Sequence, residues 1–216
     1  MKVLITGTSR GIGRAAALRF LREGHAVIGL DIAGSTIEDP AYTHLIADIS
    51  DPASLPAIDG VEILINNAGV QESGRDIDVN LKGTIFVTEK YAFQDAIRAV
   101  LFNASASAST GAEFPEYTAS KGGVVAYMKN TALRLAKRGA VCNSLSAGGV
   151  TTELNAHIME DPTLWQQVLD ETLLGKWASP EEMADFIYFM TVINKSMTGQ
   201  DLLVDNGEAL RSNFIW

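Results

Sequence analysis

Tyr117 and Lys121 are the residues whose types and spacing most directly suggest chemistry. On a helix, side chains four residues apart lie on the same face, so an ammonium group can lie within several Å of a phenol. A free tyrosine has a pKa of about 10, and a positive charge at about 4 Å with an effective dielectric constant near 20 would favour the phenolate by roughly 4 kcal/mol. The pair could therefore exchange a proton near neutral pH. The pattern is common, however, and a solvated lysine beside a half-buried tyrosine is its ordinary alternative.

The N-terminal segment predicts a strand, a glycine-rich turn and a helix in succession. An aliphatic run over 3–5 is followed by three glycines within 7–13 and then by a helical apolar pattern over 16–21. Such glycines allow a tight turn and a close approach of the backbone to a pyrophosphate, whose charge the helix N-terminus stabilises. A second aliphatic run, 26–30, ends in Asp31, where a carboxylate can bind ribose hydroxyls. The segment therefore predicts a dinucleotide site.

Further motifs follow in the order found in the short-chain dehydrogenase/reductase family, which the chain resembles over nearly its whole length. The residues that carry the resemblance are Thr6, Gly7, Gly11, Gly13, Asp48, Ile49, Asn66, Asn67, Ala68, Gly69, Asn80, Tyr117 and Lys121. Segments 143–152 and 199–207 are similar to later motifs of the family, although Ala147 replaces a customary proline. The connections 49–61 and 70–79 are shorter than usual, a pattern most similar to the compact bacterial 3-alpha-hydroxysteroid dehydrogenase/carbonyl reductase branch.

The resemblance implies the roles of three catalytic side chains. Tyr117 would exchange a proton with the substrate oxygen, and Lys121 would lower the tyrosine pKa and bind the nicotinamide ribose. Asn80 would hold a water that connects Lys121 to solvent. Capping of a helix is the alternative role for Asn80, because asparagine is favoured at that position.

The catalytic serine of the family is displaced in this sequence. The position that it usually occupies is Ala104, and Ser105 is the next residue along the chain. We therefore expect Ser105 to be the catalytic serine, with a one-residue deletion in the loop that follows it. Ser107 is the reserve candidate, and solvation in a turn is the alternative for either serine.

The resemblance also implies a bound nicotinamide dinucleotide. Its expected contacts are Gly7, Ser9, Arg10, Gly11, Ile12, Gly13, Asp31, Asp48, Ile49, Asn67, Ala68, Gly69, Tyr117, Lys121, Val150 and Thr152. Asp31 would repel a 2′-phosphate and so favours NAD(H), whereas a basic residue at Arg10 is frequent in relatives that prefer NADP(H). NAD is therefore the expected coenzyme, with NADP possible, and no metal site is expected.

The order of the elements predicts the fold class. Alternating strands and helices indicate a single α/β domain over 1–216, with a Rossmann-type, doubly wound, mainly parallel seven-stranded sheet and helices on both faces. Strands are expected near 2–6, 26–30, 44–47, 61–66, 99–104, 140–145 and 200–204. Helices are expected near 11–23, 79–97, 116–138, 162–171 and 180–193. The segment around 153–178 is expected to form a substrate lid.

Composition agrees with a single soluble domain. With 216 residues and 47% hydrophobic content, the chain can bury a substantial core, and no apolar run approaches the ~20 residues that would span a bilayer. The net charge of −9 argues against a nucleic-acid partner. Met1 is followed at once by the first expected strand, so no leader segment is expected. Cys142 is the only cysteine, and we expect it to be buried in a strand rather than reactive. A cytoplasmic location is therefore expected.

These observations predict an NAD(P)(H)-dependent oxidoreductase that transfers a hydride between nicotinamide and a carbonyl or secondary alcohol. The bulky lid residues favour an uncharged, fairly hydrophobic substrate; they are Leu154, His157, Ile158, Met159, Trp165, Leu169, Leu173, Leu174 and Trp177. A non-catalytic dinucleotide-binding sensor is one alternative. A 3-oxoacyl-thioester reductase is another, because Lys129, Arg134 and Arg138 could form a basic patch for an acyl carrier protein.

A homodimer or homotetramer is expected, because the short connections leave sheet surface that the chain has few residues to cover. Apolar helix positions that could meet a second subunit are Ile85, Val124, Val125, Tyr127 and Met128. The tail 213–216 carries two aromatic residues and an isoleucine, which a solvated terminus would rarely expose together.

Overall fold

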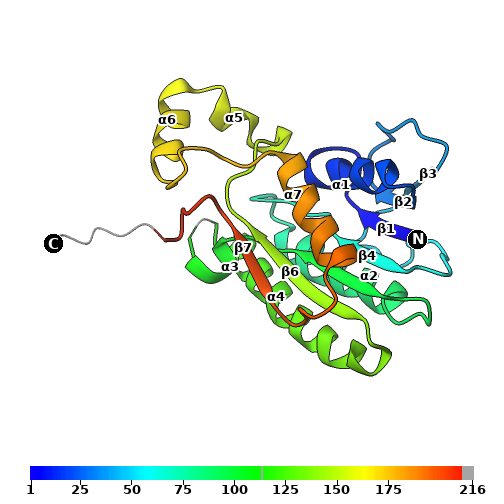
Figure 1. Cartoon of the computed structure of the whole chain (residues 1–216). Helices are drawn as coiled ribbons and strands as arrows, with labels where there is room; N and C mark the ends of the chain where they lie inside the picture. Colours follow the sequence, from blue (N-terminus) through cyan, green and yellow to red (C-terminus); the bar gives the residue numbers. More distant parts are fainter. Residues whose placement is uncertain (113, 211–216) are drawn as a thin grey trace.

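The computed structural model describes residues 1–112 and 114–210, and its centre is one parallel seven-stranded sheet. The strands lie in the order β3-β2-β1-β4-β5-β6-β7 (Figure 1). Their bounds are β1 Lys2–Thr6, β2 Ala26–Asp31, β3 Tyr42–Ile46, β4 Ile63–Asn66, β5 Ala99–Asn103, β6 Val141–Ala147 and β7 Asp201–Val204. The chain leaves β1 in one direction through β2 and β3 and in the other through β4, so a topological switch point lies between β1 and β4. In open parallel sheets, ligands bind at the strand carboxyl ends at such a point.

Helices cover the two faces of the sheet, which confirms the predicted class. The helical elements are α1 Gly11–Arg22, η1 Ile77–Gly83, α2 Thr84–Tyr91, α3 Ser107–Thr110, α4 Pro115–Leu135, η2 Ala136–Arg138, η3 Glu153–Asn155, α5 Ala156–Met159, α6 Pro162–Asp170, α7 Pro180–Tyr188 and η4 Phe189–Ile193. Figure 1 shows α1 and α7 together on one side of the sheet and α2 and α4 on the other. The segment with α5 and α6 stands apart from both layers.

Alternation along the strands divides the buried side chains between these layers. In β1, Val3 and Ile5 pack toward α1 and α7, where Phe20 and Ile187 are fully buried. Leu4 points to the opposite face and joins the core that α2 and α4 cover. Because both faces of β1 are dry, its sequence is continuously aliphatic rather than alternating. Packing on both faces thereby fixes the central strands, and the site lies at their carboxyl ends.

An irregular segment replaces a helix between β3 and β4. The described segment 47–62 contains no helix, which agrees with the short connection in the sequence. Leu55 and Ile58 nevertheless pack in the core with exposed fractions of 4% and 8%. The backbone of the segment is fixed from α2, where the Tyr91 hydroxyl donates to the Pro56 carbonyl at 2.6 Å. The chain therefore covers this part of the sheet by itself.

Two expectations from the sequence need correction, and a third lies outside the described residues. The helix expected over 79–97 ends at Tyr91, and 92–98 forms a connection to β5. Val124 and Met128 are 2% and 0% exposed and belong to the core of their own chain, so they are not free for a subunit contact. The tail 213–216 lies outside the described residues.

No helix among the described residues is long and apolar enough to cross a membrane.

The packing of the irregular segment gives a prediction about stability. Leu55→Ala should lower the free energy of unfolding by about 2–5 kcal/mol, because it removes a buried side chain and leaves a cavity. Leu174→Ala is the control, since Leu174 is 68% exposed and its truncation should change the value by less than about 0.5 kcal/mol. Urea denaturation of both variants gives the comparison. Equal stabilities of the two variants would show that the segment does not take part in the core.

Candidate active site

A cavity of about 520 Å³ opens at the carboxyl ends of the strands and extends to the segment 153–178, the expected lid. Fifteen of the residues expected at the site line it: Gly7, Arg10, Gly11, Ile12, Asp31, Asp48, Ile49, Asn67, Ala68, Gly69, Ser105, Tyr117, Lys121, Val150 and Thr152. Ser9, Gly13 and Asn80 do not line it, and each instead supports a residue that does. Residues distant in sequence are thus brought to one cavity at the switch point of the sheet.

The turn after β1 is shaped for a group that approaches the backbone. Gly7 and Gly11 have φ angles of +75° and +56°, which favour glycine over other residues. A Cβ atom on Gly13 would lie 2.0 Å from the Gly7 carbonyl oxygen, so only glycine lets α1 pack this closely on the turn. The turn and the N-terminus of α1 form a cradle that fits a dinucleotide pyrophosphate.

Asp31 ends β2 beside this turn. Its Oδ2 accepts a hydrogen bond from the Ser9 amide at 2.9 Å, and its Oδ1 accepts one from the Ala33 amide at 2.9 Å. These bonds hold the carboxylate at the cavity wall. The exposed Arg10 side chain makes no ion pair with Asp31 within 1–112 and 114–210.

Asn67 connects the glycine turn to the neighbouring strands. Its Nδ2 donates to the carbonyl oxygens of Thr6 and Gly7 at 3.0 and 3.2 Å. Its Oδ1 accepts from Asn103 Nδ2 at 2.9 Å. The ends of β1, β4 and β5 are therefore tied together by one amide side chain.

Lys121 is buried on α4 next to Tyr117. Its exposed fraction is 6%, its Nζ donates to the Asn103 carbonyl at 3.0 Å, and Nζ lies 5.6 Å from the centroid of the Tyr117 ring. Burial lowers the pKa of Lys121 to about 8, and the negative charge of Asp76 opposes that shift. The ammonium form therefore still predominates at neutral pH, where its charge favours ionisation of a nearby phenol.

Asn80 lies within the π-helical element η1, and not at a helix cap, so the capping alternative is wrong. Its Oδ1 accepts from the Val70 amide at 2.8 Å, and its Nδ2 donates to the Val70 carbonyl at 2.8 Å and to Ser120 Oγ at 3.1 Å. A Cβ atom on Gly69 would lie 3.1 Å from Asn80 Oδ1 and 3.6 Å from Lys121 Nζ. Asn80 and Lys121 thus converge on the same glycine.

The two candidate serines have different positions. Ser105 lines the cavity, and its Oγ accepts a hydrogen bond from the Ser107 amide at 3.3 Å. Ser107 is 1% exposed, does not line the cavity, and its Oγ has no hydrogen-bond partner among the described residues. Only Ser105 is placed to touch a substrate directly.

The lid contributes fewer apolar contacts than its composition suggested. Of the bulky residues expected there, Leu154, His157, Ile158 and Trp177 line the cavity, whereas Met159, Trp165, Leu169, Leu173 and Leu174 do not; Val168 lines it as well. Three carboxylates that sequence reasoning missed, Glu153, Glu171 and Glu208, also line it.

Glu208 belongs to the turn that follows β7. Its pKa is raised by burial first and then by the charges of Asp205 and Glu171. Family motifs gave no signal for Glu208, because it lies beyond the last one.

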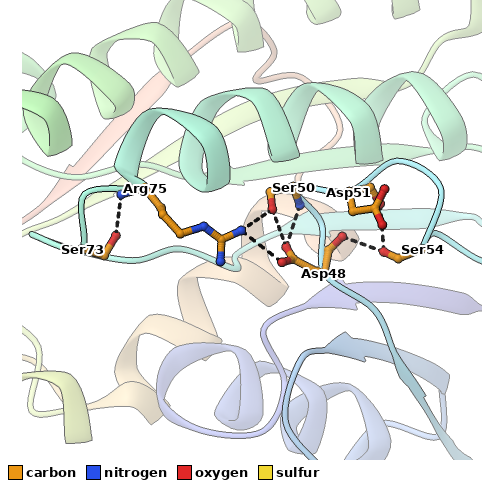
Figure 2. Close-up of polar contacts among 6 residues, drawn as sticks. All are labelled: Asp48, Ser50, Asp51, Ser54, Ser73 and Arg75. Carbon is orange, nitrogen blue, oxygen red and sulfur yellow. Dashed lines mark hydrogen bonds and ion pairs between the residues drawn. The ribbon is translucent and has the colours of Figure 1, made fainter.

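Asp48 and Ile49 form the end of the cavity away from the lid, and Arg75 lies beside them. Figure 2 shows Arg75 reaching from the segment before η1 to Asp48 and Ser50. Arg75 was missed from the sequence because it stands in a connection without a motif. Among the described residues there is no cluster of three or more His, Cys, Asp or Glu side chains that could hold a metal.

The chain is similar to known enzymes over nearly its whole length. A family model described as enoyl-(acyl carrier protein) reductase matches residues 7–208. L-rhamnose 1-dehydrogenase (NAD(P)(+)) of a Sphingomonas species is 30% identical, with 95% of this chain and 94% of that protein covered. Glucose 1-dehydrogenase of Gluconobacter oxydans is 29% identical, with 99% of this chain and 93% of that protein covered.

Among solved structures, the ligand-free aldohexose dehydrogenase of Thermoplasma acidophilum superposes with a TM-score of 0.87 at 26% identity and covers 100% of this chain and 96% of that chain. These matches agree with the glycine cradle, the switch-point cavity and the Tyr117–Lys121 pair. The chain belongs to the short-chain dehydrogenase/reductase family and is an NAD(P)-dependent oxidoreductase.

Proposed function

We propose that this protein oxidises a secondary alcohol, or reduces the corresponding carbonyl, with NAD(H) through Ser105, Tyr117, Lys121 and Asn80. The observation that carries the proposal is the buried Lys121 ammonium next to Tyr117 in a cavity that Ser105 also lines. A pure binding protein does not require a desolvated cation beside a phenol. This arrangement supports turnover over a sensor role.

The bound nicotinamide supplies or accepts the hydride. In the reductive direction, Tyr117 gives its phenolic proton to the carbonyl oxygen, and the Lys121 charge stabilises the phenolate that remains. Ser105 Oγ already accepts a hydrogen bond from the Ser107 amide, so its hydroxyl hydrogen can be donated to the same carbonyl oxygen. Asn80 fixes the Val70 backbone, and the second lone pair of its Oδ1 can bind the water that returns a proton to Lys121.

An uncharged, hydroxyl-bearing substrate fits the lid end better than a purely hydrophobic one. Glu171 and Glu208 can accept hydrogen bonds from hydroxyl groups, and the one lysine of the lid, Lys176, pairs with Glu182. Two relatives are named for L-rhamnose and glucose. We therefore propose an aldose-like polyol as substrate, in place of the hydrophobic ketone that the lid composition favoured.

The acyl-thioester alternative is weakened by the state of the basic residues on α4 and η2. Arg134 forms a bidentate pair with Glu89 at 2.6 and 2.8 Å, and Arg138 pairs with Asp95 at 3.0 Å. Their charges are largely compensated within the chain. Lys129 alone would make a poor docking site for an acidic carrier protein.

A cytoplasmic location is part of the proposal. It is supported by the buried, unpaired Cys142, which suits a reducing compartment. Cell fractionation checks it.

The proposed chemistry is tested by substitution of the proton donor. Tyr117→Phe keeps the ring and removes the transferable proton, so turnover should fall by at least ~10² while coenzyme affinity changes little. Absorbance of the reduced coenzyme is followed with L-rhamnose, glucose and cyclohexanol, and the sugars should be the better substrates.

The serines provide a matched comparison in the same assay. Ser105→Ala should impair turnover severely, and Ser107→Ala should not. The reverse result would assign the catalytic hydroxyl to Ser107, and full activity of Tyr117→Phe would contradict the proposed proton transfer.

The coenzyme preference is expected to be NAD(H) over NADP(H). The Asp31 carboxylate is held at the cavity wall by two amides, and its repulsion of a 2′-phosphate should cost at least ~1.4 kcal/mol, or tenfold in affinity. Calorimetric titration with both coenzymes measures the ratio. Asp31→Asn should reduce the preference for NAD(H) over NADP(H). Asp51→Asn, a change outside the cavity lining, should leave that preference unchanged. Tighter binding of NADP(H) than of NAD(H) by the wild type contradicts the assignment.

We also propose a homodimer or homotetramer. Large apolar side chains are exposed along the consecutive elements α7, η4 and β7. The exposed fractions are 38% for Phe186, 45% for Phe189, 58% for Ile193 and 40% for Leu203. β7 is also an edge strand, and such a surface favours a symmetric contact. Light scattering at micromolar concentration should give a multiple of 23.2 kDa; the mass of one chain would contradict the proposal.

A further inference from the structure

Asp48 is held by donors on both of its carboxylate oxygens. Its Oδ1 accepts from the Ser50 amide at 2.9 Å and from Ser50 Oγ at 2.7 Å, and its Oδ2 accepts from the Arg75 guanidinium at 3.1 Å (Figure 2). The same guanidinium nitrogen donates to Ser50 Oγ at 2.6 Å. The hydrogen bonds with Ser50 and the charge of Arg75 lower the pKa of Asp48, so it is a carboxylate at neutral pH.

Arg75 is the contact that ties this turn to another part of the site. Ser54 Oγ fixes the backbone of the turn from within, because it donates to the carbonyls of Asp48 and Asp51 at 2.7 and 2.9 Å. Arg75 instead belongs to the segment before η1, and its carbonyl accepts from the Val79 amide at 2.9 Å. It therefore links the Asp48 turn to the element that carries Asn80.

The missing helix explains why such a link matters here. Asp48 follows β3 in the irregular segment 47–62, so no helix holds its turn against the sheet. A carboxylate offers about four acceptor sites, and three of those on Asp48 are filled by Ser50 and Arg75. The remaining site belongs to Oδ2, the oxygen that Arg75 holds.

We propose that Arg75 is a positioning residue for the adenine of the coenzyme. It holds the Asp48 carboxylate so that the free acceptor site of Oδ2 can take a hydrogen bond from the adenine amino group. Asp48, Ile49 and Arg75 all line the cavity at the end away from the lid. The assignment rests on the proposed use of a nicotinamide adenine dinucleotide.

Calorimetric binding of two dinucleotides tests the assignment. One is NAD, and the other is nicotinamide hypoxanthine dinucleotide, in which an oxygen replaces the adenine amino group. Arg75→Met should weaken NAD binding by about threefold to tenfold, the range of a partly exposed charge-assisted hydrogen bond. The affinity for the hypoxanthine dinucleotide should stay within about twofold of the wild-type value. The preference of the protein for NAD over this analogue therefore falls.

Two further variants separate this role from a general electrostatic one. Ser50→Ala removes another donor to the Asp48 carboxylate and should act in the same direction as Arg75→Met. Arg98→Met is the matched control, because Arg98 pairs with Glu62 at 3.4 Å, is 70% exposed and does not line the cavity. It should leave the binding of both dinucleotides unchanged.

Other outcomes overturn the assignment. An equal loss for both dinucleotides, or no loss for NAD, shows that Arg75 does not act through the amino group. If NAD binding is unchanged and a third titration, with NADP, shows a loss, Arg75 contacts the 2′-phosphate instead. A wild-type protein that binds NAD without turning over any alcohol contradicts the proposed chemistry and not this assignment, whereas failure to bind NAD contradicts both.

Discussion

The side chain of Asn67 holds together the parts of the site that come from different strands. It donates to the carbonyls of Thr6 and Gly7 at the end of β1 and accepts from Asn103 at the end of β5. The Asn103 carbonyl in turn accepts from Lys121. Because an unpaired buried polar group costs free energy, these partners keep the glycine turn and the buried ammonium at a fixed separation. The glycine turn and the Tyr117–Lys121 pair are therefore joined by one chain of hydrogen bonds.

Close approach of the backbone is the second constraint on the site. Side chains at Gly13, Gly69 and Gly149 would collide with Gly7, crowd Asn80 and overlap Trp177, respectively. Gly13 and Gly149 let two segments meet at a distance that any larger residue would prevent, and Gly69 allows a close approach to Asn80. Lys121 is buried at the second of these contacts, and desolvation there lowers its pKa to about 8. Tight packing thus sets the electrostatics as well as the shape of the site.

The shortened connections show how a small chain retains a covered sheet. Leu55 and Ile58 fill the space under the irregular segment, and Tyr91 fixes its backbone. The short connection also leaves the Asp48 end of the cavity dependent on side-chain contacts such as that of Arg75 with Asp48. Surface ion pairs are individually weak, so this end of the site is held less firmly than the strand ends tied by Asn67.

The sequence by itself determined the fold class, the sheet and most of the cavity lining. The continuous aliphatic runs, the glycine spacing and the order of the motifs are local patterns, and local patterns specify strands, turns and the residues at strand ends. The sequence also indicated the short connections, although it did not place the end of α2 at Tyr91. Element boundaries depend on packing that no local pattern contains.

Only the tertiary structure decided which side chains meet. It placed Ser105 at the cavity wall and Ser107 behind it, and it brought Glu208 and Arg75 to opposite ends of the same cavity. These positions depend on contacts between segments far apart in the chain, and neither Glu208 nor Arg75 stands in a motif. The sequence determines what strands and turns can form, whereas the packing of the sheet and its covering segments decides which polar groups share one cavity.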